Sequence, residues 1–131
     1  MIEALGARVH LFVRLAYREP FTALFRDTLQ CEVRELDFGM SEPILLVRFP
    51  DGSAFSVEFS DLAPEPSASI DDERAFRGAW IEFRARDVDA VHRRLHEAGI
   101  SSFSHPPSQH RYFSAPGGQV FRILDVDYSG P

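Results

Sequence analysis

The sequence predicts an α+β protein made of two consecutive βαβββ modules. A strand-like alternation followed by a helix-like apolar stripe occurs twice, and further short strand patterns follow each occurrence. The first module is expected over 8–61 and the second over 78–128, with a linker rich in proline, serine and acidic residues at 62–77. We expect 1–131 to form a single domain, because a chain of 131 residues can bury one core.

The first module is expected to begin with a strand over 8–15 and a helix over 19–29. Apolar residues occupy every second position of the strand, which indicates one buried face. Pro20 suits the first turn of a helix, and an apolar stripe follows it at helical spacing. A hairpin turn is expected at 50–53. Three further strands complete the module, over 31–37, 43–49 and 54–60.

The second module repeats this order from residue 78. A strand over 79–86 alternates apolar and polar residues, and Asp87 follows it as a helix N-cap. The helix is expected to end at Gly99, since glycine favours the left-handed stop. The remaining strands are predicted over 101–104, 111–114 and 119–126.

Constant offsets between the modules support a duplication. Trp80 lies 70 positions after His10, and Arg122 lies 64 positions after Glu58. One offset for the first strand and helix and another for the last strand are what a repeated unit with a shorter meander gives.

Composition excludes several classes of partner. The net charge of −6 argues against nucleic-acid binding and against an anionic membrane surface. No apolar run approaches the roughly 20 residues that span a bilayer, and no secretory signal pattern begins the chain. Cys31 is the only cysteine, so an internal disulfide cannot form. We therefore expect a cytoplasmic protein.

This layout resembles the glyoxalase / bleomycin-resistance / extradiol-dioxygenase superfamily, also called vicinal oxygen chelate proteins. The resemblance covers nearly the whole chain. The segments that carry it are the strand containing His10, ALFRDTL at 23–29, ARDVDAVHRRLHEAG at 85–99 and APGGQVFRIL at 115–124. It implies that the modules form a U-shaped mixed sheet around a cavity, with the helices outside.

In metal-using members, the first and last strand of each module supply four ligands to that cavity. The matching positions here are His10, Glu58, Trp80 and Arg122. Trp80 stands where histidine is usual and Arg122 where glutamate is usual. Indole offers only an N–H donor and guanidinium is a permanent cation, so neither can ligate a metal. We therefore expect no metal cofactor, with a divalent ion held by His10, Glu58 and Glu82 as the alternative.

Strand alternation separates a helix-facing set from a cavity-facing set. The helix-facing residues are Leu11, Val13, Val57, Phe59, Ile81, Phe83, Phe121 and Ile123. The candidate ligand-binding residues are His10, Phe12, Arg14, Glu58, Trp80, Glu82 and Arg122. Ser56, Arg84 and Val120 share their face.

A charged group inside a cavity needs a partner. We hypothesise that Arg122 takes the place of the metal's positive charge and pairs with Glu58. The pair can be structural, or Arg122 can fix an anionic or carbonyl oxygen of a ligand. Trp80 can fill the cavity or form a stacking wall for a flat ligand. His10 can simply bond to Glu58, or serve as a base or metal ligand.

Other candidates have weaker support. His92 and His96 are four positions apart on the second helix, and we expect them on its solvated face. Cys31 is expected to be a small core residue, since the pattern places no histidine beside it. His105, His110 and Tyr112 lie near the short strands of the second module and can line the cavity rim.

Three functions remain open, and no catalytic residue is assigned. The first is a metal-independent small-molecule binding protein similar to the bleomycin-resistance type, whose acidic surface would suit a cationic or polar aromatic ligand. The second is a metal-dependent lyase, isomerase or dioxygenase with altered ligands. The third is a structural or regulatory module whose own side chains close the cavity. The resemblance and an exposed sheet edge favour a homodimer.

Overall fold

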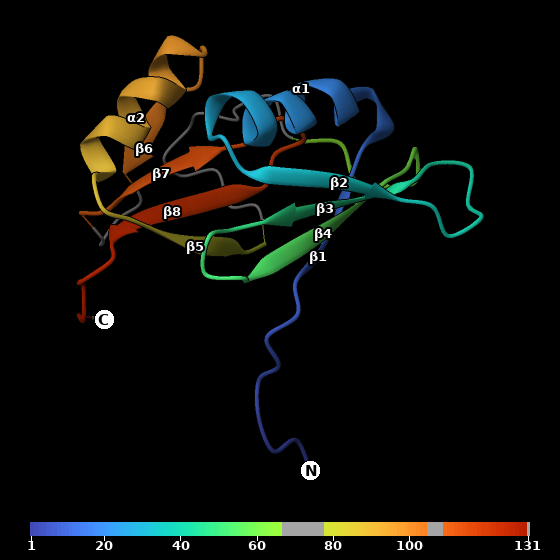
Figure 1. The fold of residues 1–131 in the computed structure, drawn as a ribbon, viewed down its shortest axis with the longest axis horizontal. Helices are drawn as coiled ribbons and strands as arrows, with labels where there is room; N and C mark the ends of the chain where they lie inside the picture. The colour runs from blue at the N-terminus through green and yellow to red at the C-terminus, as the bar shows by residue number, and fades with distance from the viewer. Residues whose placement is uncertain (67–77, 105–108, 131) are drawn as a thin grey trace.

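The computed structural model describes residues 1–66, 78–104 and 109–130. The greater part of the predicted linker at 62–77, together with His105, lies outside these described residues. Within them, strands and helices follow the predicted order, β1 to β4 in the first module and β5 to β8 in the second (Figure 1).

The first module has a helix of mixed geometry. The predicted helix is confirmed, but it starts with a 3₁₀ turn, and its last part is a π-helix in which the Leu29 N–H donates to the Leu24 carbonyl. It ends at Gln30, which has a positive φ of 55°, and the Cys31 N–H closes the end on the Phe25 carbonyl at 2.8 Å. The elements are β1 His10–Val13, η1 Leu15–Tyr17, α1 Arg18–Ala23, η2 Leu24–Thr28, β2 Glu32–Leu36, β3 Ile44–Arg48 and β4 Ala54–Phe59.

The second module confirms both predicted helix ends. The Asp87 carboxylate accepts the Ala90 N–H at 2.9 Å, which caps the start of the helix. Gly99 has a φ of 84°, the left-handed conformation that stops it. The elements are β5 Trp80–Ala85, α2 Val88–Glu97, β6 Ser102–Ser104, β7 Arg111–Ser114 and β8 Val120–Asp125.

Each module forms its own four-stranded mixed sheet, so the predicted α+β class with two βαβββ modules is confirmed. The strand orders are β1-β4-β3-β2 and β5-β8-β7-β6, and the first and last strands of each module pair in parallel. Phe12 lies opposite Glu58 in the first sheet, and Glu82 lies opposite Arg122 in the second. These pairs are related by the offsets of 70 and 64 positions that the sequence shows.

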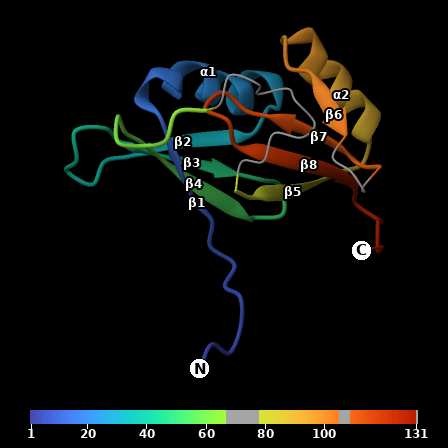
Figure 2. The ribbon, with the colours of Figure 1, turned by 180° about the vertical axis from the view of Figure 1, so that it is seen from behind.

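The core lies between the sheets and the helices. Figures 1 and 2 show α1 and α2 on the same side of the two sheets, while the N-terminal segment leaves on the other side. The Phe25 ring lies 5.2 Å from the Phe55 ring and 5.6 Å from the Phe121 ring, measured between ring centroids. The first module's helix therefore packs on residues of both modules, and a single cluster of buried side chains joins them.

The predicted helix-facing residues do face the helices. Those on β1, β4 and β8 are buried, and Ile81 and Phe83 on β5 pack against the same core. The alternate residues of these strands consequently point to the opposite face of the sheets. In the part of the chain that the structure describes, no helix is long and apolar enough to cross a membrane.

Candidate functional site

The candidate site lies on the face of the two sheets that is turned away from α1 and α2, which we call the open face. Two of its aromatic side chains are strongly exposed, Phe12 at 62% and Trp80 at 44%. Exposed large aromatic residues on a sheet face favour an interaction surface rather than a closed core. The polar residues of this face gather into two clusters, one in each module.

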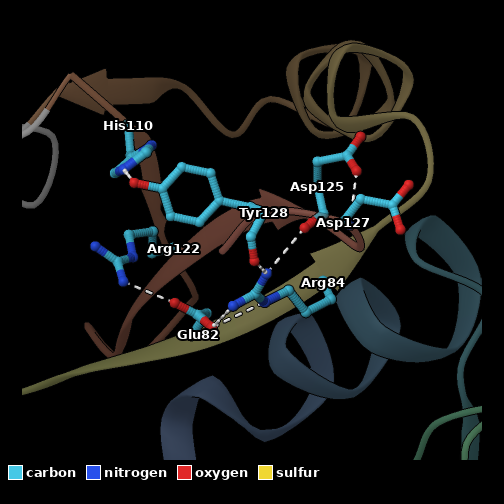
Figure 3. A network of polar contacts seen from close by, with 7 residues as sticks. All are labelled: Glu82, Arg84, His110, Arg122, Asp125, Asp127 and Tyr128. Carbon is cyan, nitrogen blue, oxygen red and sulfur yellow. Dashed lines mark hydrogen bonds and ion pairs between the residues drawn. The ribbon is translucent and has the colours of Figure 1, made fainter. Parts of the chain in front are cut away.

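The cluster of the second module is built around Arg122, and we call it the Arg122 cluster: Trp80, Glu82, Arg84 and Arg122. Arg122 Nη2 donates to Glu82 Oε1 at 2.7 Å, and Arg84 Nε donates to Glu82 Oε2 at 2.9 Å (Figure 3). The Arg122 side chain is only 11% exposed, whereas that of Glu82 is 29% exposed. One carboxylate thus serves two guanidinium groups.

Burial and pairing act in opposite directions on the charges of this cluster. Burial alone would raise the pKa of Glu82, but the hydrogen bonds from Arg122 and Arg84 outweigh it and hold that pKa below its usual value. Burial likewise opposes the charge of Arg122, yet the hydrogen bonds to Glu82 and Tyr112 raise its pKa. The pairing therefore favours the charged form of both Glu82 and Arg122.

Trp80 covers the Arg122 guanidinium. The Arg122 Cζ atom lies 4.0 Å from the centroid of the indole ring, a cation–π contact. Tyr112 on β7 is buried and meets the indole edge to face, with 6.3 Å between ring centroids. The position of Tyr112 was left open by the sequence, although its place opposite Arg122 on the neighbouring strand could have indicated it.

The predicted pair of Arg122 with Glu58 is wrong. Arg122 binds Glu82, which lies directly opposite it on the neighbouring strand β5. Glu58 belongs to β4 of the other sheet and contacts His10 instead. The face of each residue was predicted correctly, but the choice of partner depends on strand order and register.

The cluster of the first module consists of His10, Ser56 and Glu58. His10 Nδ1 lies 2.7 Å from Ser56 Oγ, and His10 Nε2 lies 3.5 Å from Glu58 Oε2. The His10 ring also meets Phe12 edge to face at 5.0 Å between centroids. Arg14 contacts other residues instead: it donates a hydrogen bond to the Ala63 carbonyl and pairs with Glu65, both of which follow β4.

The donors on the open face do not fit a divalent ion of the kind that the family resemblance implies. Two of the four matching positions carry Trp80 and Arg122, which have no lone pair to offer. Among residues 1–66, 78–104 and 109–130, no three His, Cys, Asp or Glu side chains are placed to share an ion. The alternative set of His10, Glu58 and Glu82 is thus not brought together, since Glu82 is engaged by two arginines in the second sheet.

A groove of about 1030 Å³ runs between the β3–β4 hairpin and β5. Phe49, Phe55 and Phe83 supply apolar lining, and Glu82 and Arg84 line it as well. Its lining lacks the four family positions. Glu82 and Arg84 therefore connect the Arg122 cluster to this groove, whereas Trp80 and Arg122 do not line it.

Two predictions about other residues had different outcomes. His92 was expected on a solvated face, but it is buried, because β6 packs beside α2 and Ser102 Oγ lies 2.5 Å from His92 Nδ1. Burial lowers the pKa of His92 to about 4. His96 is exposed. Cys31 packs against the core as expected, and burial raises the pKa of its thiol to about 11.

The C-terminal segment completes the surroundings of the Arg122 cluster. Arg84 Nη1 donates to the carbonyl oxygens of Asp125 and Tyr128 at 3.0 and 2.6 Å. The Tyr128 hydroxyl in turn lies 3.1 Å from His110 Nε2 (Figure 3). Arg84 thereby ties the chain end to the sheet, and His110 contacts that chain end.

Comparison of the fold with solved structures finds similar proteins across nearly the whole chain. A glyoxalase family protein from Enterococcus faecalis has 17% identity and a TM-score of 0.65, with 91% of this chain and 95% of that chain covered. A glyoxalase / bleomycin resistance protein / dioxygenase superfamily member from Sphaerobacter thermophilus DSM 20745 has 16% identity and a TM-score of 0.63, with coverage of 92% and 98%. TnmS3, an antibiotic binding protein from Streptomyces sp. CB03234, has 17% identity and a TM-score of 0.61, with coverage of 95% and 98%.

At the level of sequence, comparison with family models and with curated proteins finds no match. The similarity is therefore one of fold.

Proposed function

We propose that this chain, whose fold is that of the glyoxalase / bleomycin-resistance / dioxygenase superfamily, binds a small organic molecule on its open face without a metal ion. The observation that carries this proposal is the arrangement of Trp80 over Arg122. The indole is exposed on one side and held on the other by a guanidinium that is itself anchored to Glu82. A flat apolar surface fixed in this way is suited to stacking against a planar ligand.

The chemistry of the matching positions supports a binding role over the metal-dependent alternative. Trp80 and Arg122 occupy two of the four positions, and both are committed to each other and to Glu82. A lyase, isomerase or dioxygenase of the metal-using kind would need ligating side chains there. A module closed by its own side chains is disfavoured by the exposure of Phe12 and Trp80.

The similar structures give general support. These proteins include an antibiotic binding protein, TnmS3, and a fosfomycin resistance protein, FosX from Listeria monocytogenes, at 17% and 16% identity. Recognition of small molecules is therefore a use to which this fold is put. At such low identity the names do not specify the ligand of this chain.

Homodimerisation and a cytosolic setting are part of the proposal. Phe12 is 62% exposed on β1, which is an edge strand of the first sheet, and a second copy that packs along β1 would shield both the Phe12 ring and the strand edge. A single cysteine suits a reducing compartment. Sedimentation velocity should show a dimer that Phe12→Ser weakens, and a wild-type chain that stays monomeric at high concentration would contradict this.

A thermal-shift screen of small organic molecules tests the binding role. The screen is run with a chelator present, on the wild type and on Trp80→Ala. Phe38→Ala is the matched control, because Phe38 is an exposed aromatic residue, at 68% against 44% for Trp80, and lies between β2 and β3, away from the Arg122 cluster. We expect planar molecules to stabilise the wild type and the control but not Trp80→Ala. Hits that stabilise Trp80→Ala equally, or only when metal is added, would overturn the proposal.

A further inference from the structure

The Arg122 cluster carries an excess of positive charge. Arg84 and Arg122 share the single carboxylate of Glu82. The Nε–H of Arg122 is buried and has no hydrogen-bond partner among the described residues, so part of this guanidinium is not compensated locally. Against the opposing effect of burial, the hydrogen bond between them lowers the pKa of Glu82 and raises that of Arg122, which favours the charged form of both groups.

Other charged groups nearby do not cancel this excess at the indole. Glu58 lies in the other sheet and contacts His10. The carboxylates of Asp125 and Asp127 lie beyond Arg84, and only backbone carbonyls of this segment accept hydrogen bonds from Arg84 (Figure 3). The positive charge nearest to the exposed face of Trp80 is therefore Arg122, directly behind the ring.

We infer that the open face selects planar aromatic ligands that carry negative charge, such as aromatic carboxylates or phenolates, over neutral and cationic ones of the same shape. This inference rests on the proposed function and names its ligand class. A cation behind the indole draws electron density away from the exposed side, which then attracts an electron-rich or anionic ring. The acidic composition of the whole chain would suggest the opposite preference, but at physiological salt charges more than about 8 Å apart are largely screened.

The separation sets the expected size of the effect. The guanidinium carbon lies 4.0 Å from the indole centroid, and a stacked ligand adds about 3.5 Å, so the charge and the ligand ring are about 7.5 Å apart. Between the dielectric limits of water and of a protein surface, one such charge changes an affinity by about 3- to 40-fold at low salt.

The test uses the fact that Trp80 is the only tryptophan in the chain. Saturable quenching of its fluorescence is measured with 4-nitrobenzoate, 4-nitrobenzamide and 4-nitrobenzylammonium. Each titration is done at low salt and again at about 1 M salt, where the Debye length is about 3 Å. Free N-acetyltryptophanamide supplies the correction for collisional quenching. We expect the anion to bind at least about threefold more tightly than the amide, the cation to bind most weakly, and the difference to shrink with salt.

Two variants should change the preference for the anion in opposite directions. Arg122→Met should abolish the preference for the anion. Glu82→Gln removes the only carboxylate of the cluster, so it should increase the preference, and it serves even if Arg122→Met does not fold. Equal binding of all three probes, or a smaller preference in Glu82→Gln, would overturn the inference and leave the proposed binding role standing. Absence of saturable quenching by every probe would overturn both.

Discussion

The pairing of Arg122 with Glu82 can be tested by a double-mutant cycle. The cycle combines Arg122→Met, which removes the charge but leaves an unbranched side chain, with Glu82→Gln, which removes the charge but keeps the shape of the side chain. A second cycle combines Arg122→Met with Glu58→Gln. The two acidic residues lie on the same face, and only Glu82 contacts Arg122.

The structure allows the magnitudes to be worked out. Removing one partner of a fully buried ion pair costs about 3–5 kcal/mol. Here Glu82 is 29% exposed and keeps Arg84, so we expect Arg122→Met to lower the free energy of unfolding by about 2 kcal/mol. For 131 residues this corresponds to a fall in Tm of roughly 8 °C.

Urea denaturation of the wild type, the single variants and the double variants gives the coupling energies. We expect a coupling of about 1–2 kcal/mol between Arg122 and Glu82, and none beyond about 0.5 kcal/mol between Arg122 and Glu58. A larger coupling to Glu58 than to Glu82 would refute the register of β5 on β8 and with it the description of the Arg122 cluster.

Three further predictions concern residues away from the open face. His92 is neutral when folded, so the unfolded chain alone takes up a proton as the pH falls from 6.5 towards 4, and stability should drop by about 3 kcal/mol over that window. Urea midpoints against pH should show this drop in the wild type and in His96→Gln but not in His92→Gln. Gln30 has a φ of 55°, and Gln30→Gly should raise the free energy of unfolding by up to about 1 kcal/mol; a lower urea midpoint would contradict the left-handed stop. The Cys31 thiol, whose pKa is raised to about 11, should react with a disulfide reagent at pH 8 far more slowly in the native protein than in urea, and equal rates would contradict its burial.

Most of the fold could be predicted because the chain repeats its pattern. Alternation identified which side of each strand faces the helices, and the capping of Asp87 and the stop at Gly99 followed from local chemistry. The superfamily's fold, predicted from order and spacing, is confirmed by structures that share only 16–17% identity. Local patterns are sufficient for these features because each depends on neighbours in the sequence.

The site could be predicted only in part, because its contacts join distant segments. Alternation placed Glu58, Glu82 and Arg122 on one face, but strand order decided that Glu82 is the partner. The burial of His92 depends on Ser102, which β6 brings against the helix. A helical spacing alone could not distinguish this from an exposed histidine.

The proposed function requires that the open face, with Trp80 and Arg122 at two of the four matching positions, binds its ligand without a metal ion. The most direct test is the metal content of the protein after incubation with nickel, zinc, manganese and ferrous iron, followed by dialysis and elemental mass spectrometry. We expect no retained ion in the wild type and no change in His10→Ala or Glu58→Ala. Retention of about one ion per chain, lost in both variants, would contradict the proposed function and favour the metal-dependent enzyme instead.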